Sequence, residues 1–214
     1  RIGPPHGTSP VVIWAGGPAS VLPQMQTGFA WINAAIAAQE LCRERGFPFA
    51  FIGGVAVQCW GEPRVTEDVD LTLFCGFGNE APVIQAFLSR FAPRIPDAAE
   101  FAEERRVLLL KTSEGIPIDV ALAGFPFEES LCRRAMLREF LPGISLLVCQ
   151  ADALVVLKAF AGRSKDWMDI ENVLVRQGAR LDWDYILKEL KPLVELKEAP
   201  EALVHLERLR RSVE

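Results

Sequence analysis

The chain has 214 residues, and 23 lysines and arginines against 28 aspartates and glutamates give a formal net charge of −5. This mild acidity is not typical of a general nucleic-acid binder, and a composition that is 50% hydrophobic excludes disordered and fibrous proteins. The apolar stretches are too short for a membrane span, and five scattered cysteines without a C-x-x-C pair indicate neither a disulfide framework nor a zinc site. We therefore expect a cytoplasmic protein with reduced thiols and no membrane partner.

The sequence divides into three parts by pattern. Residues 1–24 contain five prolines and four glycines without any helical or alternating period, which predicts an irregular extension. Residues 25–150 mix strand and helix patterns, whereas residues 151–214 show helical spacing only. The predicted fold class is α+β, with a small mixed β-sheet and flanking helices, followed by a C-terminal helical region that closes a cleft.

The predicted elements of residues 25–150 begin with an amphipathic helix at 27–45, where Thr27 is a plausible cap and Gly46 a plausible stop. A short strand at 49–52 leads through Gly53 and Gly54 into a brief helix. The elements that follow are helices and strands in this order: helix 55–60, strand 69–74, helix 81–91, strands 106–111 and 117–123, and a strand at 144–148.

The pattern of residues 151–214 predicts four helices, at 151–161, 165–176, 183–196 and 200–211. Asp152 and Asp182 occupy positions where helix caps are expected. Gly162 and Gly178 occupy positions where helices are expected to stop.

The candidate site begins with two aspartates that follow the glycine pair. Thirteen residues separate Gly54 from Asp68, and Asp70 lies two residues further on. On a strand, alternate side chains point to the same face, so the two Cα atoms would lie about 6 to 7 Å apart. Two carboxylates so placed can share divalent cations.

A third carboxylate, Asp119, lies in the apolar strand pattern at 117–123. If this strand pairs with the strand at 69–74, all three carboxylates come together. Three hard oxygen donors suit Mg²⁺ or Mn²⁺ and not zinc. Glycines before a helix allow close approach of a phosphate to free backbone N–H groups. Together these features predict a site for a nucleoside triphosphate with its metal.

The order of glycine pair, Asp68-x-Asp70 and a later single aspartate resembles the DNA polymerase β-type nucleotidyltransferase superfamily. Within it, the early pattern from Arg64 and Thr66 to the aspartates resembles the AbiEii-like toxin branch. The late segment 157–170, with a lysine followed by R-x-K-D-x-x-D, is similar to that branch as well. The resemblance covers about residues 45–180.

The resemblance implies two-metal transfer of a nucleotidyl group from a nucleoside triphosphate. It implies that Asp68, Asp70 and Asp119 hold the metals, and that Asp119 also helps to deprotonate the acceptor. It implies that Gly53 and Gly54 contact the triphosphate. Related branches often have serine at the second glycine, so Gly54 would offer only backbone contacts.

The same resemblance implies that Lys158 meets the triphosphate as a point charge. Asp166 would position Lys158 or the acceptor. Arg64 is well placed to touch phosphate, and Thr66 shapes the loop that leads into the strand.

Structural alternatives exist for several of these residues. Asp68 and Asp70 could lie on a solvated strand edge, and Lys158 could extend its stem to solvent. Asp166 and Asp169 could belong to an ordinary cap and an i,i+4 pair network with the lysine at 165. A second D-x-D, at 182–184, opens a predicted helix and is interpreted as a cap, and the isolated His205 as a surface residue.

The predicted function is transfer of a nucleoside monophosphate to an RNA such as tRNA, or to a protein, by a toxin-like enzyme with a possible cognate antitoxin. An antibiotic nucleotidyltransferase of the aminoglycoside or lincosamide type, with a small-molecule acceptor, is the first alternative. A catalytically idle partner that keeps the fold is the second. Host toxicity, drug resistance, or absence of metal-dependent nucleotide binding would distinguish the three.

Overall fold

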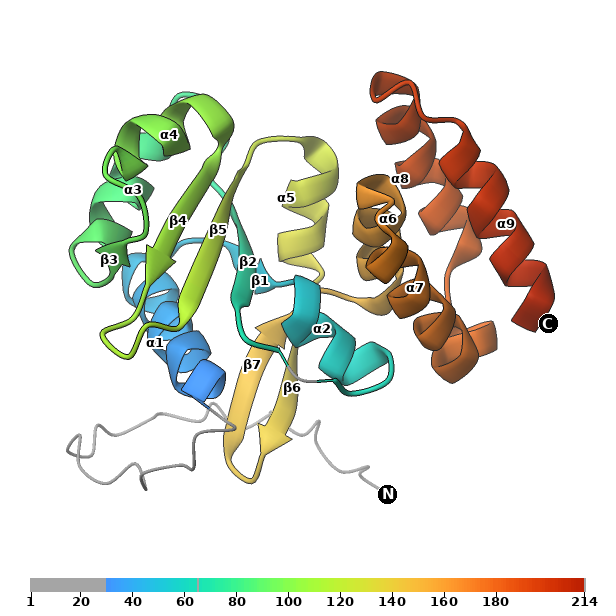
Figure 1. Cartoon of the computed structure of the whole chain (residues 1–214), viewed down its shortest axis with the longest axis horizontal. Helices are drawn as coiled ribbons and strands as arrows, with labels where there is room; N and C mark the ends of the chain where they lie inside the picture. The colour runs from blue at the N-terminus through green and yellow to red at the C-terminus, as the bar shows by residue number, and fades with distance from the viewer. Residues whose placement is uncertain (1–29, 65, 214) are drawn as a thin grey trace, which may run out of the picture.

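The computed structural model describes residues 30–64 and 66–213, so the predicted extension at 1–24 and the proposed cap Thr27 lie outside the described residues. Within this part of the chain the strands form a single mixed sheet in the order β3-β4-β5-β2-β1-β7-β6 (Figure 1). The strands are β1 Phe49–Phe51, β2 Val69–Phe74, β3 Ala92–Pro93, β4 Val107–Lys111, β5 Pro117–Ala123, β6 Met136–Leu141 and β7 Ile144–Val148.

Helices flank this sheet and then form a group of their own. Figure 1 shows α6 to α9 packed together at one side of the sheet. The helices are α1 Ala30–Arg45, α2 Gly53–Trp60, α3 Glu80–Leu88, α4 Ala98–Arg105, α5 Pro126–Arg133, α6 Ala151–Ala161, α7 Ser164–Gln177, α8 Trp183–Leu196 and α9 Glu201–Val213, with a short 3₁₀ turn at Gly178–Arg180. No helix in the described ranges has the length and apolar character that a membrane crossing requires.

The centre of the sheet sets the position of the carboxylates. β2 runs parallel to β5 and antiparallel to β1, and the register places Asp70 beside Asp119. All three residues of β1 are buried, as are four of the six in β2, because helices cover both faces of these strands. The predicted pairing of the two aspartate-bearing strands is confirmed.

Helix α6 connects the sheet to the helical group. It packs against α2 on one side and against α7, α8 and α9 on the others. Its sequence is apolar nearly all round, and eight of its eleven residues are buried. A charged side chain on this helix is therefore largely buried and needs polar partners within the protein or in a pocket.

Most predicted boundaries agree with the structure, and the exceptions have physical reasons. The two glycines are the first residues of α2 and not a turn before it, although Gly53 itself has a positive φ of 53°, a left-handed conformation that glycine adopts readily. Asp68 lies just before β2 and not on it. Elements α4, α5, β3 and β6 were not predicted, since they are short and β6 is mostly exposed.

The helix ends are partly as predicted. Gly162 ends α6 with a positive φ of 69°, and the Asp182 carboxylate caps α8 by accepting a hydrogen bond from the N–H of Tyr185 at 3.0 Å. The prediction that Asp152 caps a helix is wrong. Gln150 takes that position in α6, and the Asp152 carboxylate instead accepts a hydrogen bond from the N–H of Asp182 at 3.0 Å.

Candidate active site

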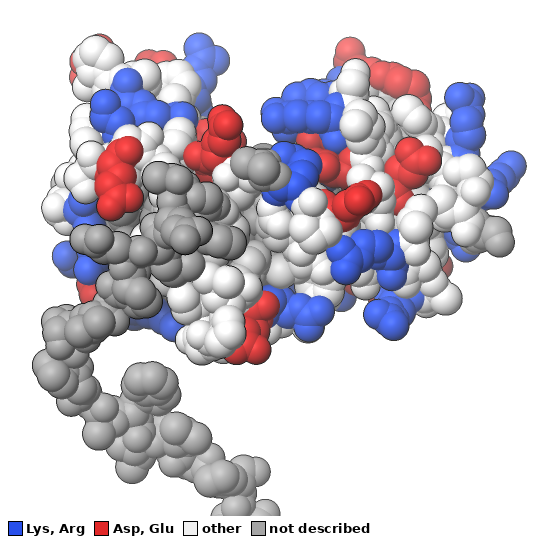
Figure 2. Space-filling model, turned by 60° about the horizontal axis from the view of Figure 1, so that its bottom comes forward, with Lys and Arg blue, Asp and Glu red and all other residues white. Residues whose placement is uncertain are grey.

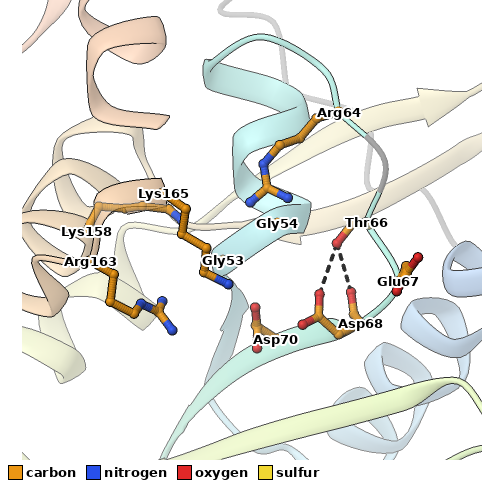
Figure 3. A pocket seen from close by; sticks show the side chains of 10 residues that line it. All are labelled: Gly53, Gly54, Arg64, Thr66, Glu67, Asp68, Asp70, Lys158, Arg163 and Lys165. Atoms are coloured by element: carbon orange, nitrogen blue, oxygen red, sulfur yellow. Dashed lines mark hydrogen bonds between the residues drawn. The ribbon is translucent and has the colours of Figure 1, made fainter. Parts of the chain in front are cut away.

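A pocket of about 260 Å³ lies where the start of α2, the loop before β2 and the helices α6 and α7 meet. On the face shown in Figure 2, charged side chains of both signs gather around a hollow between two parts of the molecule. The pocket residues, shown in Figure 3, are Gly53, Gly54, Arg64, Thr66, Glu67, Asp68, Asp70, Lys158, Arg163 and Lys165. The structure thus brings together every predicted site residue except Asp119 and Asp166, which lie just outside the lining.

The acidic wall of the pocket consists of Asp68 and Asp70, beside the start of α2. A Cβ atom at Gly53 would lie 1.9 Å from Oδ2 of Asp70, so this position has room only for glycine. Burial, with the nearby charges of Asp68 and Asp119, raises the pKa of Asp70 to about 6, although the backbone N–H of Gly54 and the Lys158 ammonium oppose this. The carboxylates therefore repel one another within this wall.

Thr66 supports Asp68 from the loop. Its hydroxyl lies 3.2 Å from the main-chain oxygen and 3.1 Å from Oδ1 of Asp68, and the side chain is buried. A Cβ atom at Gly54 would meet this hydroxyl at 2.3 Å. The glycine at this position is thus explained by the Thr66 hydroxyl, which takes the space that a side chain at residue 54 would need.

Asp119 lies next to Asp70 in the sheet, but its carboxylate pairs with the Arg94 guanidinium. Burial raises the pKa of Asp119 and the Arg94 charge opposes the increase. Within residues 30–64 and 66–213, no three acidic, histidine or cysteine side chains are gathered as a metal site. The role of Asp119 as a third metal ligand stays a prediction.

The basic wall of the pocket is built on α6 and α7. Lys158 is only 6% exposed, so the interpretation that it extends to solvent is wrong. Its ammonium donates to Oδ1 of Asp166 at 3.0 Å and to Oδ2 of Asp169 at 2.6 Å. An ammonium has three N–H donors, so after these two contacts one donor remains for a ligand in the pocket that it lines.

Each of these two buried aspartates also pairs with an arginine. Arg163 forms a bidentate pair with Asp166, and Arg64 forms one with Asp169 in which both N–O distances are 3.1 Å. Burial alone would raise the pKa of each aspartate, but the hydrogen bonds from the arginines and Lys158 outweigh it and hold both pKa values below the usual range. Lys158 contacts both aspartates and so links the two arginine–aspartate pairs. The network consists of the side chains of Arg64, Asp169, Lys158, Asp166 and Arg163.

Sequence reasoning missed several members of this site. Arg163 and Lys165 line the pocket, and Lys165 extends toward Asp70 in Figure 3, although the R-x-K-D pattern had already placed them near each other. Asp169 pairs with a distant arginine and with Lys158, not within an i,i+4 network on its own helix. Arg94 gave no signal, because it follows a two-residue edge strand without any periodic pattern.

His205 is half-buried and stacks on Trp167, with ring centroids 4.1 Å apart. The interpretation of His205 as a simple surface residue is therefore wrong. This contact joins α9 to α7 and contributes to the packing of the helical group.

The chain matches no protein-family model and no curated protein. Among solved structures, the antibiotic-resistance factor ANT(2'')-Ia superposes with a TM-score of 0.54 at 13% identity, over 84% of this chain and 99% of that one. An antigenic nucleotidyltransferase-like protein from Paracoccidioides brasiliensis gives 0.48 at 15% identity, over 82% and 91% of the two chains. The lincosamide antibiotic adenylyltransferase LnuA gives 0.44 at 12% identity, over 66% and 94%.

The first of these likenesses, together with the mixed sheet and its flanking helices, shows that the chain has a nucleotidyltransferase fold. At this level of identity a structural likeness establishes the fold alone. It does not distinguish the AbiEii-like branch from the others.

Proposed function

We propose that the protein is a metal-dependent nucleotidyltransferase that transfers a nucleoside monophosphate from a nucleoside triphosphate to an acceptor. The observation that supports this most directly is the pocket itself, in which Asp68 and Asp70 face the cations of Lys158, Arg163 and Lys165. A polyphosphate with a divalent cation complements both walls at once, since its metal suits the carboxylates and its oxygens suit the cations.

The donor set fits Mg²⁺ or Mn²⁺. Asp68 and Asp70 offer hard carboxylate oxygens, and their mutual repulsion in the metal-free protein is the condition that a divalent cation relieves. Asp119 would join them once its carboxylate leaves Arg94. When bound, the metals supply positive charge at the reacting phosphate and lower the pKa of an acceptor hydroxyl.

The protein's own groups would then divide the remaining tasks. Lys158, Arg163 and Lys165 bind the triphosphate and stabilise charge on the leaving pyrophosphate. The start of α2 at Gly53 and Gly54 brings backbone N–H groups to the phosphates. Asp119 takes the proton from the acceptor hydroxyl, which then forms the new bond to the α-phosphorus as the bond to pyrophosphate breaks.

Arg64 and Thr66 act less directly in this proposal. Thr66 orients Asp68 through the hydroxyl contact described above, and Arg64 lines the pocket close enough to Asp68 to interact with its charge. Asp166 holds Lys158 and Arg163, so we place it among the positioning groups.

For the acceptor we propose an RNA such as tRNA, or a protein, in a toxin-like reaction that a cognate antitoxin could control. The resemblance of the motifs around Asp68 and Lys158 to the AbiEii-like branch supports this choice. A small-molecule antibiotic is the second candidate, favoured by the structural likeness to the antibiotic-resistance factor ANT(2'')-Ia. A catalytically idle binding partner is the third.

The test is incubation with each α-labelled nucleoside triphosphate in turn, with Mg²⁺ or Mn²⁺ and with total RNA, total protein or a panel of aminoglycosides and lincosamides. We expect label in one acceptor class with the wild type and none with Asp68→Asn/Asp70→Asn. The matched control is Asp182→Asn/Asp184→Asn, which changes a D-x-D pair of the same spacing at the start of α8. Transfer retained in the Asp68/Asp70 variant would contradict the proposal, and absence of nucleotide binding in the wild type would favour the idle partner.

A further inference from the structure

Four cationic side chains line the pocket, and a single buried carboxylate, that of Asp169, contacts two of them that come from different parts of the chain, Arg64 and Lys158. We propose that Asp169 is a positioning residue that ties Arg64 to Lys158, so that cations from the loop before β2 and from α6 form one preassembled clamp for a polyphosphate. The clamp rests on the proposed function for its substrate, but its geometry can be tested without any transfer reaction.

The contacts of Asp169 use both of its carboxylate oxygens. Oδ1 accepts from Nε of Arg64 at 3.1 Å, and Oδ2 accepts from Nη2 of Arg64 at 3.1 Å and from Lys158 Nζ at 2.6 Å. Asp169 itself is 4% exposed. A bidentate pair fixes the plane of a guanidinium as well as its distance, so Asp169 determines where Arg64 points.

Arg64 connects this anchor to the acidic wall. It lies on the segment that leads to Thr66 and Asp68, and its side chain is 43% exposed, with one face on Asp169 and the rest at the pocket. An unanchored arginine on an exposed loop would populate many rotamers, and fixing one of them on ligand binding would cost conformational entropy. The tie to Asp169 removes this cost before the ligand arrives.

The charges around Asp169 explain why we expect it to position the cations of the pocket and not to increase the affinity for a polyphosphate. Asp166 and Asp169 neutralise part of the charge of Lys158, Arg64 and Arg163. Removing the Asp169 charge therefore loosens Arg64 and Lys158 but also raises the net positive charge of the pocket. For a polyphosphate these two effects oppose each other in binding, whereas alignment of the reacting groups depends on order alone.

The first variant is Asp169→Asn, which keeps the size of the side chain and removes its charge. We expect kcat to fall by about tenfold to a hundredfold, the value of one charged hydrogen bond, while the Kd for inorganic tripolyphosphate with Mg²⁺ changes less than about threefold. The matched control is Asp152→Asn. Asp152 is also a buried aspartate of the helical group and pairs with Arg134, but it does not line the pocket, so kcat should stay unchanged.

The second variant is Arg64→Lys, which keeps the positive charge at an exposed position and removes the bidentate fork. This variant should fold even where the loss of a buried carboxylate prevents folding. We expect the same split, with a lower kcat and an almost unchanged Kd for tripolyphosphate.

Limited trypsin digestion gives a readout that does not depend on activity. Trypsin must take the Arg64 side chain into its own pocket, and Asp169 holds that side chain in the wild type. We expect cleavage after Arg64 to be several times faster in Asp169→Asn than in the wild type or in Asp152→Asn. Equal cleavage rates, or an unchanged kcat in both Asp169→Asn and Arg64→Lys, would overturn the proposal. A wild type without transfer would refute the proposed function only, since the digestion would still decide whether the tie exists.

Discussion

The two walls of the pocket use charge in opposite ways. On the basic wall, Lys158 and its neighbours are matched by Asp166 and Asp169, and the pKa values of these aspartates lie below the usual range. On the acidic wall, burial and the nearby charge of Asp68 raise the pKa of Asp70 to about 6. The basic wall thus contributes to the stability of the folded protein, whereas the acidic wall lowers it until a cation binds.

The largest effect should follow from changing the acidic wall. Asp70→Asn should lower transfer by about a thousandfold or more, because it removes a metal ligand and a charge at the reacting centre. The same change should leave the free energy of unfolding unchanged or raise it by about 1 kcal/mol, since it removes a charge that burial and the neighbouring carboxylates disfavour. Label transfer and urea unfolding in metal-free buffer measure the two effects. A clear loss of stability would show that this wall is structural.

A change in the basic wall should instead lower the free energy of unfolding. Lys158→Met leaves two buried carboxylates without their shared cation, so the free energy of unfolding should fall by about 3 kcal/mol. Lys165→Met is the matched control, because Lys165 lines the same pocket but is exposed, and its removal should change stability by about 0.5 kcal/mol or less. Both variants should weaken tripolyphosphate binding. Equal stability losses would contradict the distinction between a buried and an exposed cation.

The sequence predicted the acidic wall better than the basic one, because the residues of the acidic wall are close in sequence whereas some contacts of the basic wall join distant residues. Asp68 and Asp70 are only two residues apart in sequence, so they lie close together even though Asp68 precedes β2. The partners of Lys158 also lie nearby, and the late motif pointed to Asp166. Arg64 and Asp169 are far apart in sequence, and only the packing of α2 against α7 brings them together.

The sheet shows the same limit. Both β2 and β5 were predicted as strands from their apolar patterns, and their pairing was considered, whereas its parallel direction was not predicted. The edge strand β3, which precedes Arg94, has only two residues and no such pattern. The sequence therefore placed Asp119 on an apolar strand, but it did not indicate that the Arg94 guanidinium pairs with its carboxylate.

The pH dependence of stability should separate the walls further. Because Asp166 and Asp169 have folded pKa values below their unfolded values, they contribute stability above about pH 4, and this contribution is lost as the pH falls through the folded pKa values. The free energy of unfolding of the wild type should thus fall more on acidification from pH 4 to pH 3 than that of Asp169→Asn. Urea unfolding at half-unit pH steps measures both slopes. If the free energy of unfolding depends on pH in the same way in both proteins, the charged carboxylate of Asp169 is not stabilised in the folded state.

The smallest effect should come from Arg94, whose guanidinium pairs with the Asp119 carboxylate beside the acidic wall. Arg94→Gln frees the Asp119 carboxylate from an ion pair whose partners are both partly exposed, and such pairs contribute about 1 kcal/mol or less. If Asp119 is a metal ligand, Mn²⁺ should therefore bind about two- to fivefold more tightly to this variant, as measured by electron paramagnetic resonance without nucleotide. Arg90→Gln, which breaks the exposed pair with Glu44, is the control and should leave Mn²⁺ affinity unchanged. An unchanged affinity in Arg94→Gln would remove Asp119 from the proposed metal ligands and leave only Asp68 and Asp70 in that role, so the proton from the acceptor would need another base.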